Sequence, residues 1–563
     1  MSKIYEIADE YVESFAALDP IAATSVGVTG YDHLLTDYSP AGAEARADLA
    51  RTTLAALAAA RPTDDHDRIA AAVMQERLHT GLDLHDHGER LRDVRVIGSP
   101  LQSIRQCFDL MPYDTDADWE TAAARMEAIP SAIAGLRAAL TEGLDRGISS
   151  ARRQAIAAAD QASTWSGTAG SDADGSSPFF VALAERHERE APGGTPLSDR
   201  LAKAALRATQ SYAEMARWLR DEYARRTTQR DPAGAERYAL HARAFCGADL
   251  DLTETYEWGW EELRRIEHAM GEVGERLLPG EPLTAVIEHL EHDPHRSIDG
   301  VDAFRQWLQD LLDSTVAELD GKHFDIAGPV RKVEACIAPP GGAAAMYYTS
   351  PSEDFSRPGR TWYPTLGKTH FPLWREVSIC YHEGVPGHHL QVAQVHYLAD
   401  TLSRYQRLLG WVSGHGEGWA LYAERLMGEL GYLDDAGFEL GMLTAQAMRA
   451  VRVVVDIGMH LELPIPLDEK FHPGERWTPE LALPFVIERS RFPADFMASE
   501  VDRYLGWPGQ AISYKVGERV WLDARADARR RHGAAFDLKA FHAFALDLGS
   551  MGLGPFKGEM ARF

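Results

Sequence analysis

The sequence contains few cysteines and no long apolar run. Its four cysteines, Cys107, Cys246, Cys336 and Cys380, lie far apart and fit no paired metal-ligand spacing. We therefore expect free thiols in a reducing compartment, and hence a cytoplasmic protein. No stretch reaches the 18 or so consecutive apolar residues that a membrane span requires, and the first residues lack the basic leader and apolar centre of an export signal. These absences predict no membrane partner.

An excess of basic side chains is also missing. The 58 Lys and Arg side chains face 85 Asp and Glu, which gives a formal net charge of -27. Because phosphate binding needs a basic face, nucleic acid is not expected as a partner, whereas neutral or cationic substrates suit such a field. Glycine motifs for nucleotides and dinucleotides are absent as well. Nucleotide hydrolysis and cofactor-dependent redox chemistry therefore lose their usual sequence support.

Apolar residues at helical spacing dominate the first part of the chain. With 563 residues, 45% of them hydrophobic, the protein can bury a large core. We predict a mainly α fold, with a helical N-terminal part at 1–320 and a catalytic part at 321–563. One continuous domain is the alternative. The clearest loop is the Gly/Ser/Asp-rich segment 167–178.

Three short segments then interrupt the helical pattern. They are rich in β-branched and aromatic residues, are broken by Pro and Gly, and span 330–340, 344–351 and 359–367. They predict a small β-sheet. Extended peptides often bind by adding a strand to an exposed sheet edge, so this sheet is either a substrate-binding edge or a structural hairpin. Tyr348 in the second segment is a candidate substrate-binding residue.

The stretch Y-H-E-G-V-P-G-H-H-L-Q follows and contains a lengthened form of the zinc-peptidase pattern H-E-x-x-H. His382 and Glu383 are adjacent, and His388 and His389 come after a Gly-Val-Pro-Gly insert. On an undistorted helix, residues seven apart are about 10.5 Å apart along the axis, and residues six apart point in different directions. Pro386 and its flanking glycines break the helix. The break predicts a bulge that returns His388 or His389 to His382.

This pattern predicts a hydrolytic zinc site. In H-E-x-x-H the two histidines hold one zinc ion and the glutamate takes a proton from the zinc-bound water. Glu383 is accordingly the predicted general base, and His382 and His388 are the predicted ligands. His389 is the rival for the second position, and otherwise supports the site.

A third protein ligand is expected in such a site. Glu417 lies downstream in a helical segment, and the neighbouring Gly416 and Gly418 indicate close packing. We take Glu417 as the ligand, with His415 as its rival. Glu424 is seven residues further on and shares a helix face with Glu417, so it can orient a ligand histidine.

Several motifs support a family resemblance: HEGVPGHHLQ, EGWALYAE, RVVVDIGMH, EVDRYLGWPGQAISYKVG and FDLKAFHAFALDLG. Together they resemble the bacterial domain-of-unknown-function family 885, over roughly the last third of the chain. The metal motif and the downstream glutamates also resemble thimet oligopeptidase and neurolysin, with a two-residue insert. The resemblance implies a neurolysin-like, multi-helix zinc-peptidase fold, with the small sheet beside the active-site helix and a deep substrate channel.

The resemblance also implies a tyrosine late in the chain that stabilises the tetrahedral intermediate. Tyr514 in S-Y-K-V-G occupies that place, with Lys515 beside it, and a neutral phenol can donate to an oxyanion. Arg452, Asp456 and His460 form one helical stripe. Asp456 can orient either neighbour and Arg452 can hold a substrate carboxylate, or all three can belong to a buried ion network.

We therefore predict a zinc-dependent peptidase with one zinc ion and a peptide or small amide as substrate. Three alternatives remain: a metal-dependent hydrolase of a non-peptide amide or ester, a helical scaffold with a vestigial metal site, and an iron site with two histidines and one carboxylate. The presence of Glu383 favours hydrolysis. The sequence determines neither exo- versus endopeptidase action nor the oligomeric state.

Overall fold

Helices make up most of the protein in the computed structural model, which describes residues 2–169, 177–190, 194–338 and 345–563. Helix accounts for 68% of the residues and strand for 5%. The predicted mainly α fold with a small amount of sheet is therefore confirmed. Most of the predicted loop 167–178 lies outside the described residues, since these omit 170–176.

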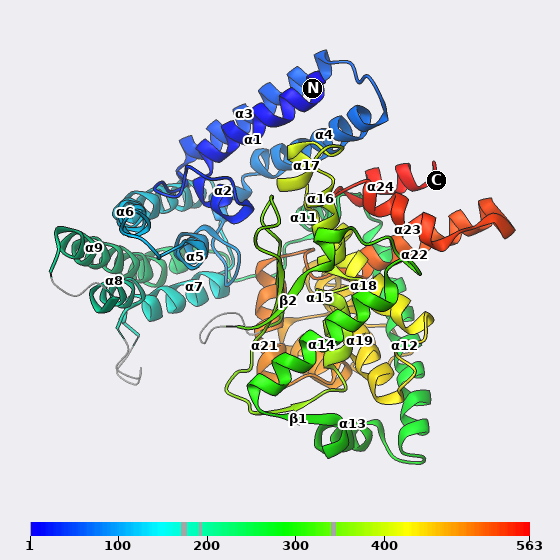
Figure 1. Ribbon diagram of the computed structural model, residues 1–563. Coiled ribbons are helices and arrows are strands. Elements are labelled where there is room, and N and C mark those ends of the chain that lie inside the picture. The colour runs from blue at the N-terminus through cyan, green and yellow to red at the C-terminus, as the bar shows by residue number, and fades with distance from the viewer. Residues whose placement is uncertain (1, 170–176, 191–193, 339–344) are drawn as a thin grey trace. The chain divides into compact units, whose positions relative to one another are not determined.

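The chain divides into two compact units that alternate along the sequence (Figure 1). Unit 1 consists of Met1–Thr63, Leu78–Ala233 and Ser499–Trp507. Unit 2 consists of Asp64–Arg77, Gly234–Ala498 and Pro508–Phe563. This division differs from the predicted boundary at residue 320. The reason is tertiary packing, because helix α12 (Leu252–Leu277) lies along helix α19 (Ala436–Leu461) in unit 2.

In its described part, unit 1 is built of helices joined by loops, with one isolated β-bridge between Ala151 and Thr228. Its helices are α1 (Lys3–Leu18), α2 (Pro20–Val26), α3 (Pro40–Ala59), α5 (Pro100–Gln106), α6 (Asp116–Asp145), α7 (Arg152–Trp165), α8 (Phe179–Glu190), α9 (Pro196–Trp218) and α10 (Ala224–Arg226), with the short turns η1 (Glu89–Arg92), η2 (Cys107–Leu110) and η3 (Leu219–Tyr223). Helices α4 (Asp65–Asp86) and α21 (Ala494–Gly506) contain the points where the chain passes between units. The sequence sets the helix starts: Ser39 caps α3 ahead of Pro40, and Thr115 forms a capping box with Asp118 at α6.

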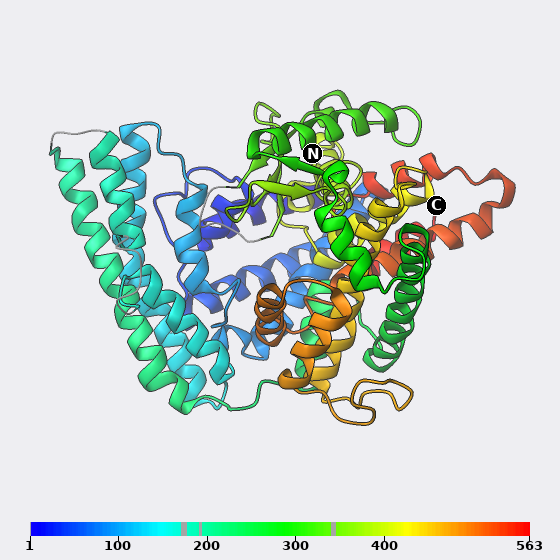
Figure 2. The same cartoon turned by 90° about the horizontal axis from the view of Figure 1, so that it is seen from below.

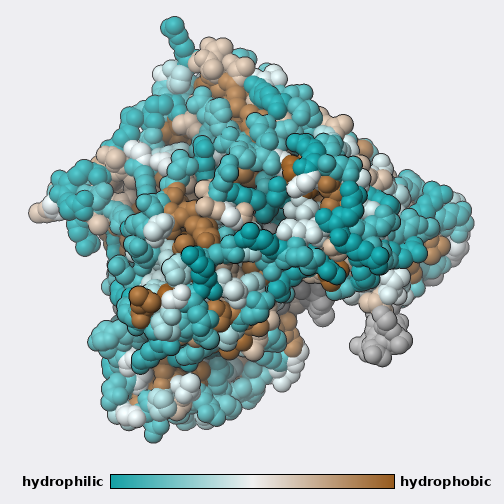
Figure 3. All heavy atoms as spheres, turned by 180° about the vertical axis from the view of Figure 1, so that it is seen from behind, coloured by the Kyte–Doolittle hydropathy of each residue, from teal (hydrophilic) through white to brown (hydrophobic). Residues whose placement is uncertain are grey.

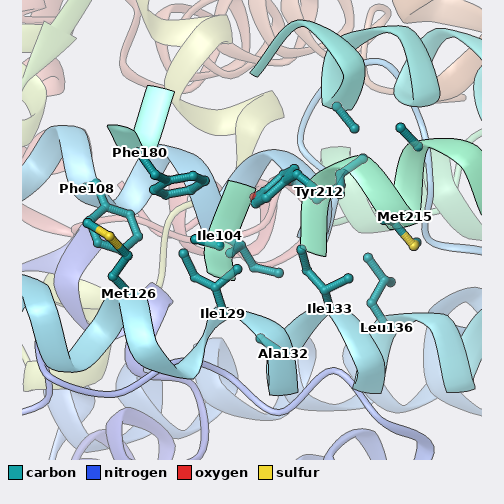
Figure 4. Close-up of a cluster of buried hydrophobic side chains, with 14 of the residues drawn as sticks. Ile104, Phe108, Met126, Ile129, Ala132, Ile133, Leu136, Phe180, Tyr212 and Met215 are labelled. Atoms are coloured by element: carbon teal, nitrogen blue, oxygen red, sulfur yellow. The ribbon is translucent and has the colours of Figure 1, made fainter. Parts of the chain in front are cut away.

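The core of unit 1 lies where α6 and α9 pack together. In Figure 2 the long helices of this unit, cyan to teal, run alongside one another. Figure 4 shows Ile129 and Ile133 of α6 beneath Phe180 of α8 and Tyr212 of α9. All four side chains are buried, and the phenol of Tyr212 donates to the carbonyl of Leu101 at 2.9 Å. Small alanines elsewhere in these helices allow the close approach.

Unit 2 holds the remaining helices. They are α11 (Ala235–Cys246), α12, α13 (Leu283–His292), α14 (Val301–Leu319), α15 (Glu376–Glu383), α16 (His388–Tyr397), α17 (Arg404–Leu408), α18 (Ser413–Glu429), α19, α20 (Pro479–Ser490), α22 (Ser513–His532), α23 (Leu538–Asp547) and α24 (Leu553–Met560), with η4 (Pro294–Arg296), η5 (Gly328–Arg331) and η6 (Gly533–Ala535). Helix α18 packs closely against α22, where Gly418 meets Gly517. Helix α19 is buried along most of its length.

The three predicted strand segments form one sheet in unit 2. Strands β2 (Val333–Ile337), β4 (Gly359–Tyr363) and β3 (Tyr347–Thr349) lie in the order β2-β4-β3, with β2 parallel and β3 antiparallel to β4. A second, two-stranded sheet pairs β1 (Ser297–Asp299) with β5 (His370–Pro372). The β2-β4-β3 sheet packs on α14 and α15 through the buried side chains of Leu308, Leu312, Val333, Tyr363 and Cys380. It therefore supports the helix that carries the first half of the metal motif.

Hydrophilic residues predominate on the face that Figure 3 shows, and hydrophobic residues form separate patches there. The four cysteines are free thiols, and Cys107, Cys246 and Cys380 are buried. Burial raises the pKa of each of these three thiols to about 12, so they are poor nucleophiles. Among the described helices, none combines the length and apolar character that crossing a membrane demands.

Candidate metal centre

A four-residue loop separates α15 from α16 and breaks the metal motif as the sequence predicts. Both glycines of the loop are needed for close approach: a Cβ on Gly387 would collide with the carbonyl of His382, and a Cβ on Gly384 with the side chain of Leu312. A new helix therefore starts at the second half of the motif, so the first residue of α16, His388, returns to His382. Figure 1 shows α15, α16 and α18 close together within unit 2.

Three side chains converge at this point: His382, His388 and Glu417. Their ligand atoms all lie within 4.8 Å of one another, and Glu417 Oε2 is 3.5 Å from His382 Nε2 and 3.4 Å from His388 Nε2. Ligands about 2.1 Å from a tetrahedral zinc ion would be about 3.4 Å apart. Burial would raise the pKa of Glu417, but the two histidines hold it well below its usual range. The donor set and its spacing fit one zinc ion.

Glu417 is positioned by the glycines on either side of it in α18. A Cβ on Gly416 would collide with the ring of Trp411, and a Cβ on Gly418 would collide with the backbone of Gly517 in α22. Trp411 and α22 therefore press against the turn that carries Glu417. The close packing that the sequence indicates around this glutamate is present.

Glu424, two helical turns beyond Glu417, fixes the ring of His382. Its Oε1 atom is 2.7 Å from His382 Nδ1, and its Oε2 atom accepts a hydrogen bond from Ser378 Oγ at 2.6 Å. The carboxylate is only 1% exposed. Burial would lower the pKa of His382, but hydrogen bonds to Glu417 and Glu424 outweigh it and raise the pKa to about 9. Because Nδ1 is held by Glu424, Nε2 is directed into the cluster.

His389 points away from the cluster. Its Nε2 is 2.7 Å from the carbonyl of Val330, and its Nδ1 is 3.1 Å from the hydroxyl of Tyr348. The ring is fully buried, and burial lowers its pKa to about 4, so it is neutral. Since Nε2 must donate to the carbonyl, Nδ1 accepts from the phenol. The structure thus places His388, and not His389, with His382.

His415, the rival to Glu417, also lies elsewhere. Its ring contacts Trp521 and Phe556, and its Nδ1 is 3.3 Å from Gln391 Nε2. Burial lowers the pKa of His415 to about 3. This histidine belongs to the aromatic core between α18, α22 and α24.

A cavity of about 480 Å³ borders the cluster. Among the residues lining it are seven that the sequence singles out: His382, Glu383, His388, Glu417, Tyr348, Arg452 and Tyr514. Glu383, the last residue of α15, is 7% exposed and shares this cavity with the three candidate ligand side chains. The volume lies within the range of pockets for small molecules and short peptides, roughly 300–1,000 Å³.

Arg452 and Tyr514 form a pair in the cavity wall. The guanidinium carbon of Arg452 lies 4.7 Å from the centre of the Tyr514 ring, a cation–π contact. Helix α19 supplies the arginine and α22 the tyrosine. The pair thus joins two helices at the edge of the cavity.

The other members of the Arg452 stripe are part of the protein interior. Asp456 Oδ2 accepts from the Tyr238 hydroxyl at 2.8 Å and from the Gly509 amide at 2.9 Å, and its Oδ1 is 3.6 Å from His460 Nε2. Asp456 and His460 are at most 1% exposed and do not line the cavity. Of the two roles considered for them, the structure shows the buried network.

Lys515 does not accompany Tyr514, contrary to the expectation. Its Nζ donates to Glu262 at 2.7 Å and to Gln446 at 2.8 Å, and it pairs with Glu518. The reason is helical geometry, since adjacent residues of α22 point about 100° apart. Lys515 therefore holds α12, α19 and α22 together, away from the cavity.

The cavity side chains that sequence reasoning missed include two arginines and a tryptophan: Arg375, Arg449 and Trp411. The spacing of Arg449, three residues before Arg452 in M-R-A-V-R, places both on one helix face and is a signal for it. Nothing local distinguishes Arg375 or Trp411. They reach the cavity because of how their segments pack.

Comparisons with known proteins establish the family and the fold. A crystal structure of a candidate lipoprotein from Colwellia psychrerythraea is similar, with a TM-score of 0.82 and 23% identity over 100% of this chain and 99% of that one. A candidate lipoprotein of unknown function from Shewanella oneidensis has a TM-score of 0.75 and 17% identity over 99% of each chain. Among curated proteins, none matches. The model of the DUF885 family, bacterial proteins of unknown function, matches residues 20–560, and the chain therefore belongs to this family.

Proposed function

We propose that this protein is a zinc-dependent hydrolase that cleaves peptides. The observation that carries the proposal is the convergence of His382, His388 and Glu417 in the wall of a cavity that Glu383 also lines. Two imidazoles and one carboxylate are one of the ligand sets found in catalytic zinc sites. These three protein ligands leave the fourth coordination position for substrate or water.

The protein's own residues supply the proton transfers. Glu383 accepts a proton from the attacking water as its oxygen adds to the scissile carbonyl carbon, and it passes that proton to the departing amine nitrogen. The C–N bond breaks, one product gains OH and becomes a carboxylic acid, and the other gains H and becomes an amine. Zinc, when bound, supplies Lewis acidity, which polarises a carbonyl and makes water more acidic.

Tyr514 completes the proposed site as a donor to the tetrahedral oxyanion. Its ring is anchored against Arg452, and it shares the cavity with the metal cluster. A neutral phenol donates one hydrogen bond without needing to be deprotonated, which suits a developing negative charge.

The sheet supports a peptide as substrate. Strand β3 pairs with β4 on one side, and in the described part of the chain no strand pairs with its other side. Tyr347 and Tyr348 of this strand line the cavity. An extended peptide can add to such an edge through main-chain hydrogen bonds. The neurolysin-like architecture and enclosed channel that the family resemblance implies belong to this same proposal.

A metal-dependent hydrolase of a non-peptide amide or ester would use the same groups, so only its substrates distinguish it. The proposed location is the cytoplasm, which suits four free thiols. The two similar solved structures are of candidate lipoproteins. Fractionation of cells producing the full-length protein decides between a soluble and a membrane-attached form.

The test combines metal analysis with a peptide-library digest read by mass spectrometry. Wild-type protein should bind one zinc per chain and cleave peptides, whereas Glu383→Gln should keep zinc and lose at least the roughly 10²- to 10⁴-fold that general-base catalysis contributes. Glu272→Gln, at an exposed position of α12, is the matched control and should behave as wild type. A metal-free wild-type protein, or undiminished cleavage by Glu383→Gln, would refute the proposal.

A further inference from the structure

The cavity carries charge of the opposite sign to the protein as a whole. The protein has a net charge of -27, yet the only acidic residues lining the cavity in the described chain are Glu383 and Glu417, both part of the candidate metal centre. Beyond that centre, the charged lining residues are Arg375, Arg449 and Arg452. The neutral or cationic substrate that overall charge suggests is therefore not what the cavity favours.

Arg449 has unused hydrogen-bonding capacity. Its Nη1 donates to the carbonyl of Ala445 in its own helix at 3.2 Å, while its Nε is buried without a partner. No acidic side chain of the described residues forms an ion pair with it. Elsewhere in unit 2, Arg489 pairs with Glu267, and Arg425 with Glu518. A half-buried guanidinium that pairs with no acidic side chain is stabilised when a bound ligand supplies the missing hydrogen-bond acceptors.

The other two arginines are held in place by aromatic rings. Arg452 lies over Tyr514. Arg375 lies 4.1 Å from the ring centre of Trp374 and 5.0 Å from that of Phe492, and it donates to the carbonyl of Arg491 at 3.1 Å. Stacked guanidinium groups keep their charge and a fixed orientation. Arg375 also forms an ion pair with Glu291 at 3.3 Å, which neutralises part of its charge, so Arg452 is the one of the two that is arranged in advance for an anion.

The remaining walls are mainly apolar, with Ile379, Val392, Met448, Phe492 and Phe496 among them. Such walls suit uncharged side chains of a substrate. The negative group that the arginines bind should therefore come from the peptide backbone, where every peptide with a free C-terminus carries a carboxylate. Helix α19 lines the cavity from Gly441 to Arg452, about 16 Å at 1.5 Å per residue. That length matches about five extended peptide residues at 3.3–3.6 Å each.

We propose that Arg449 and Arg452 bind the free C-terminal carboxylate of a short peptide substrate, with Arg375 contributing positive charge. This inference rests on the proposed peptidase function and narrows it: the enzyme acts near the C-terminus of short peptides, because a carboxylate fixed on α19 sets how many residues reach the metal centre. Guanidinium groups bind carboxylates with two parallel hydrogen bonds and so supply orientation as well as affinity.

The experiment measures binding without turnover. Zinc-loaded Glu383→Gln protein is titrated calorimetrically with three pentapeptides: Ala-Leu-Phe-Leu-Ala as free acid, the same peptide as C-terminal amide, and Ala-Leu-Phe-Leu-Glu amide. The free acid should bind roughly 10- to 100-fold more tightly than its amide, as expected for charge-assisted hydrogen bonds. Adding Arg449→Gln should remove this preference, whereas Arg276→Gln, at an exposed ion pair, should preserve it.

Three results would overturn the inference: equal binding of the free acid and its amide, equal binding of the free acid and the glutamyl amide, or no binding of any of the three. The second would mean that the arginines recognise a side-chain carboxylate. The comparison of free acid with amide needs no arginine variant, so it stands even if Arg449→Gln fails to fold. All titrations use Glu383→Gln protein, which lacks the general base, so the binding result does not depend on catalysis. Failure of the wild-type protein to hydrolyse peptides would refute the proposed function without changing the binding result.

Discussion

Replacement of Glu424 by glutamine should weaken zinc binding while keeping the fold. The carboxylate is 1% exposed and holds both His382 Nδ1, at 2.7 Å, and Ser378 Oγ, at 2.6 Å. Glutamine has the same shape, and its amide oxygen can still accept from one of these partners. What it loses is the negative charge behind the imidazole and one of the two acceptor oxygens.

The expected size of the effect follows from these contacts. Outer partners of metal-binding histidines typically contribute 10- to 100-fold in metal affinity, about 1.4–2.8 kcal/mol. A hydrogen bond to a charged group contributes about 1.5–3 kcal/mol, so loss of the charge-assisted bond to His382 accounts for the whole range. We therefore expect the zinc dissociation constant of Glu424→Gln to rise by about 10- to 100-fold.

The assay is competition for zinc against a chromophoric chelator at fixed pH, with thermal unfolding of the metal-free protein measured in parallel. Glu429→Gln is the matched control, because this glutamate lies on the same helix but is 43% exposed and pairs with Arg525. It should bind zinc as wild type does. A folded Glu424→Gln protein with zinc affinity within twofold of wild type would refute the reasoning, since His382 would then be oriented without its carboxylate partner.

Three further predictions test the site. His388→Ala should lose zinc, whereas His389→Ala should retain it and instead lower the melting temperature, because His389 contacts the carbonyl of Val330; loss of zinc in His389→Ala alone would reverse the assignment. Tyr514→Phe should keep zinc and substrate binding but lose about 10²- to 10³-fold in turnover, the effect of one oxyanion donor; unchanged turnover per zinc-loaded molecule would remove it from the site. Chelation should lower the melting temperature of the wild type, because free zinc at 1,000 times its dissociation constant stabilises a protein by about 4.1 kcal/mol; an unchanged melting temperature, with zinc removal verified, would argue against a preformed site.

Much of the fold was determined by local sequence patterns. Apolar spacing predicted the helices, and short aromatic and β-branched segments predicted β2, β3 and β4, because these patterns act within a few residues. The break after Glu383 was equally local, since Gly384, Pro386 and Gly387 do not continue a helix. The family could be inferred in the same way from short motifs, and the match over residues 20–560 confirms it.

The choice between adjacent histidines required the tertiary structure. His388 and His389 have the same chemistry and neighbouring positions, so the sequence left both open. The carbonyl of Val330, 59 residues away, takes up Nε2 of His389 and leaves His388 for the cluster. Such a partner depends on how η5 packs against α16, which no local pattern encodes.

Tertiary packing likewise decided which side chains line the cavity. Lys515, adjacent to Tyr514 in sequence, lies in an ion network with Glu262, while Arg449, which the motifs did not single out, reaches the cavity. Net charge is a sum over the whole chain, whereas the charge that a substrate meets depends on which side chains face one space. The sequence by itself determined which residue types form the candidate metal centre, and tertiary packing decided which side chains surround it, because those contacts join residues far apart in the chain.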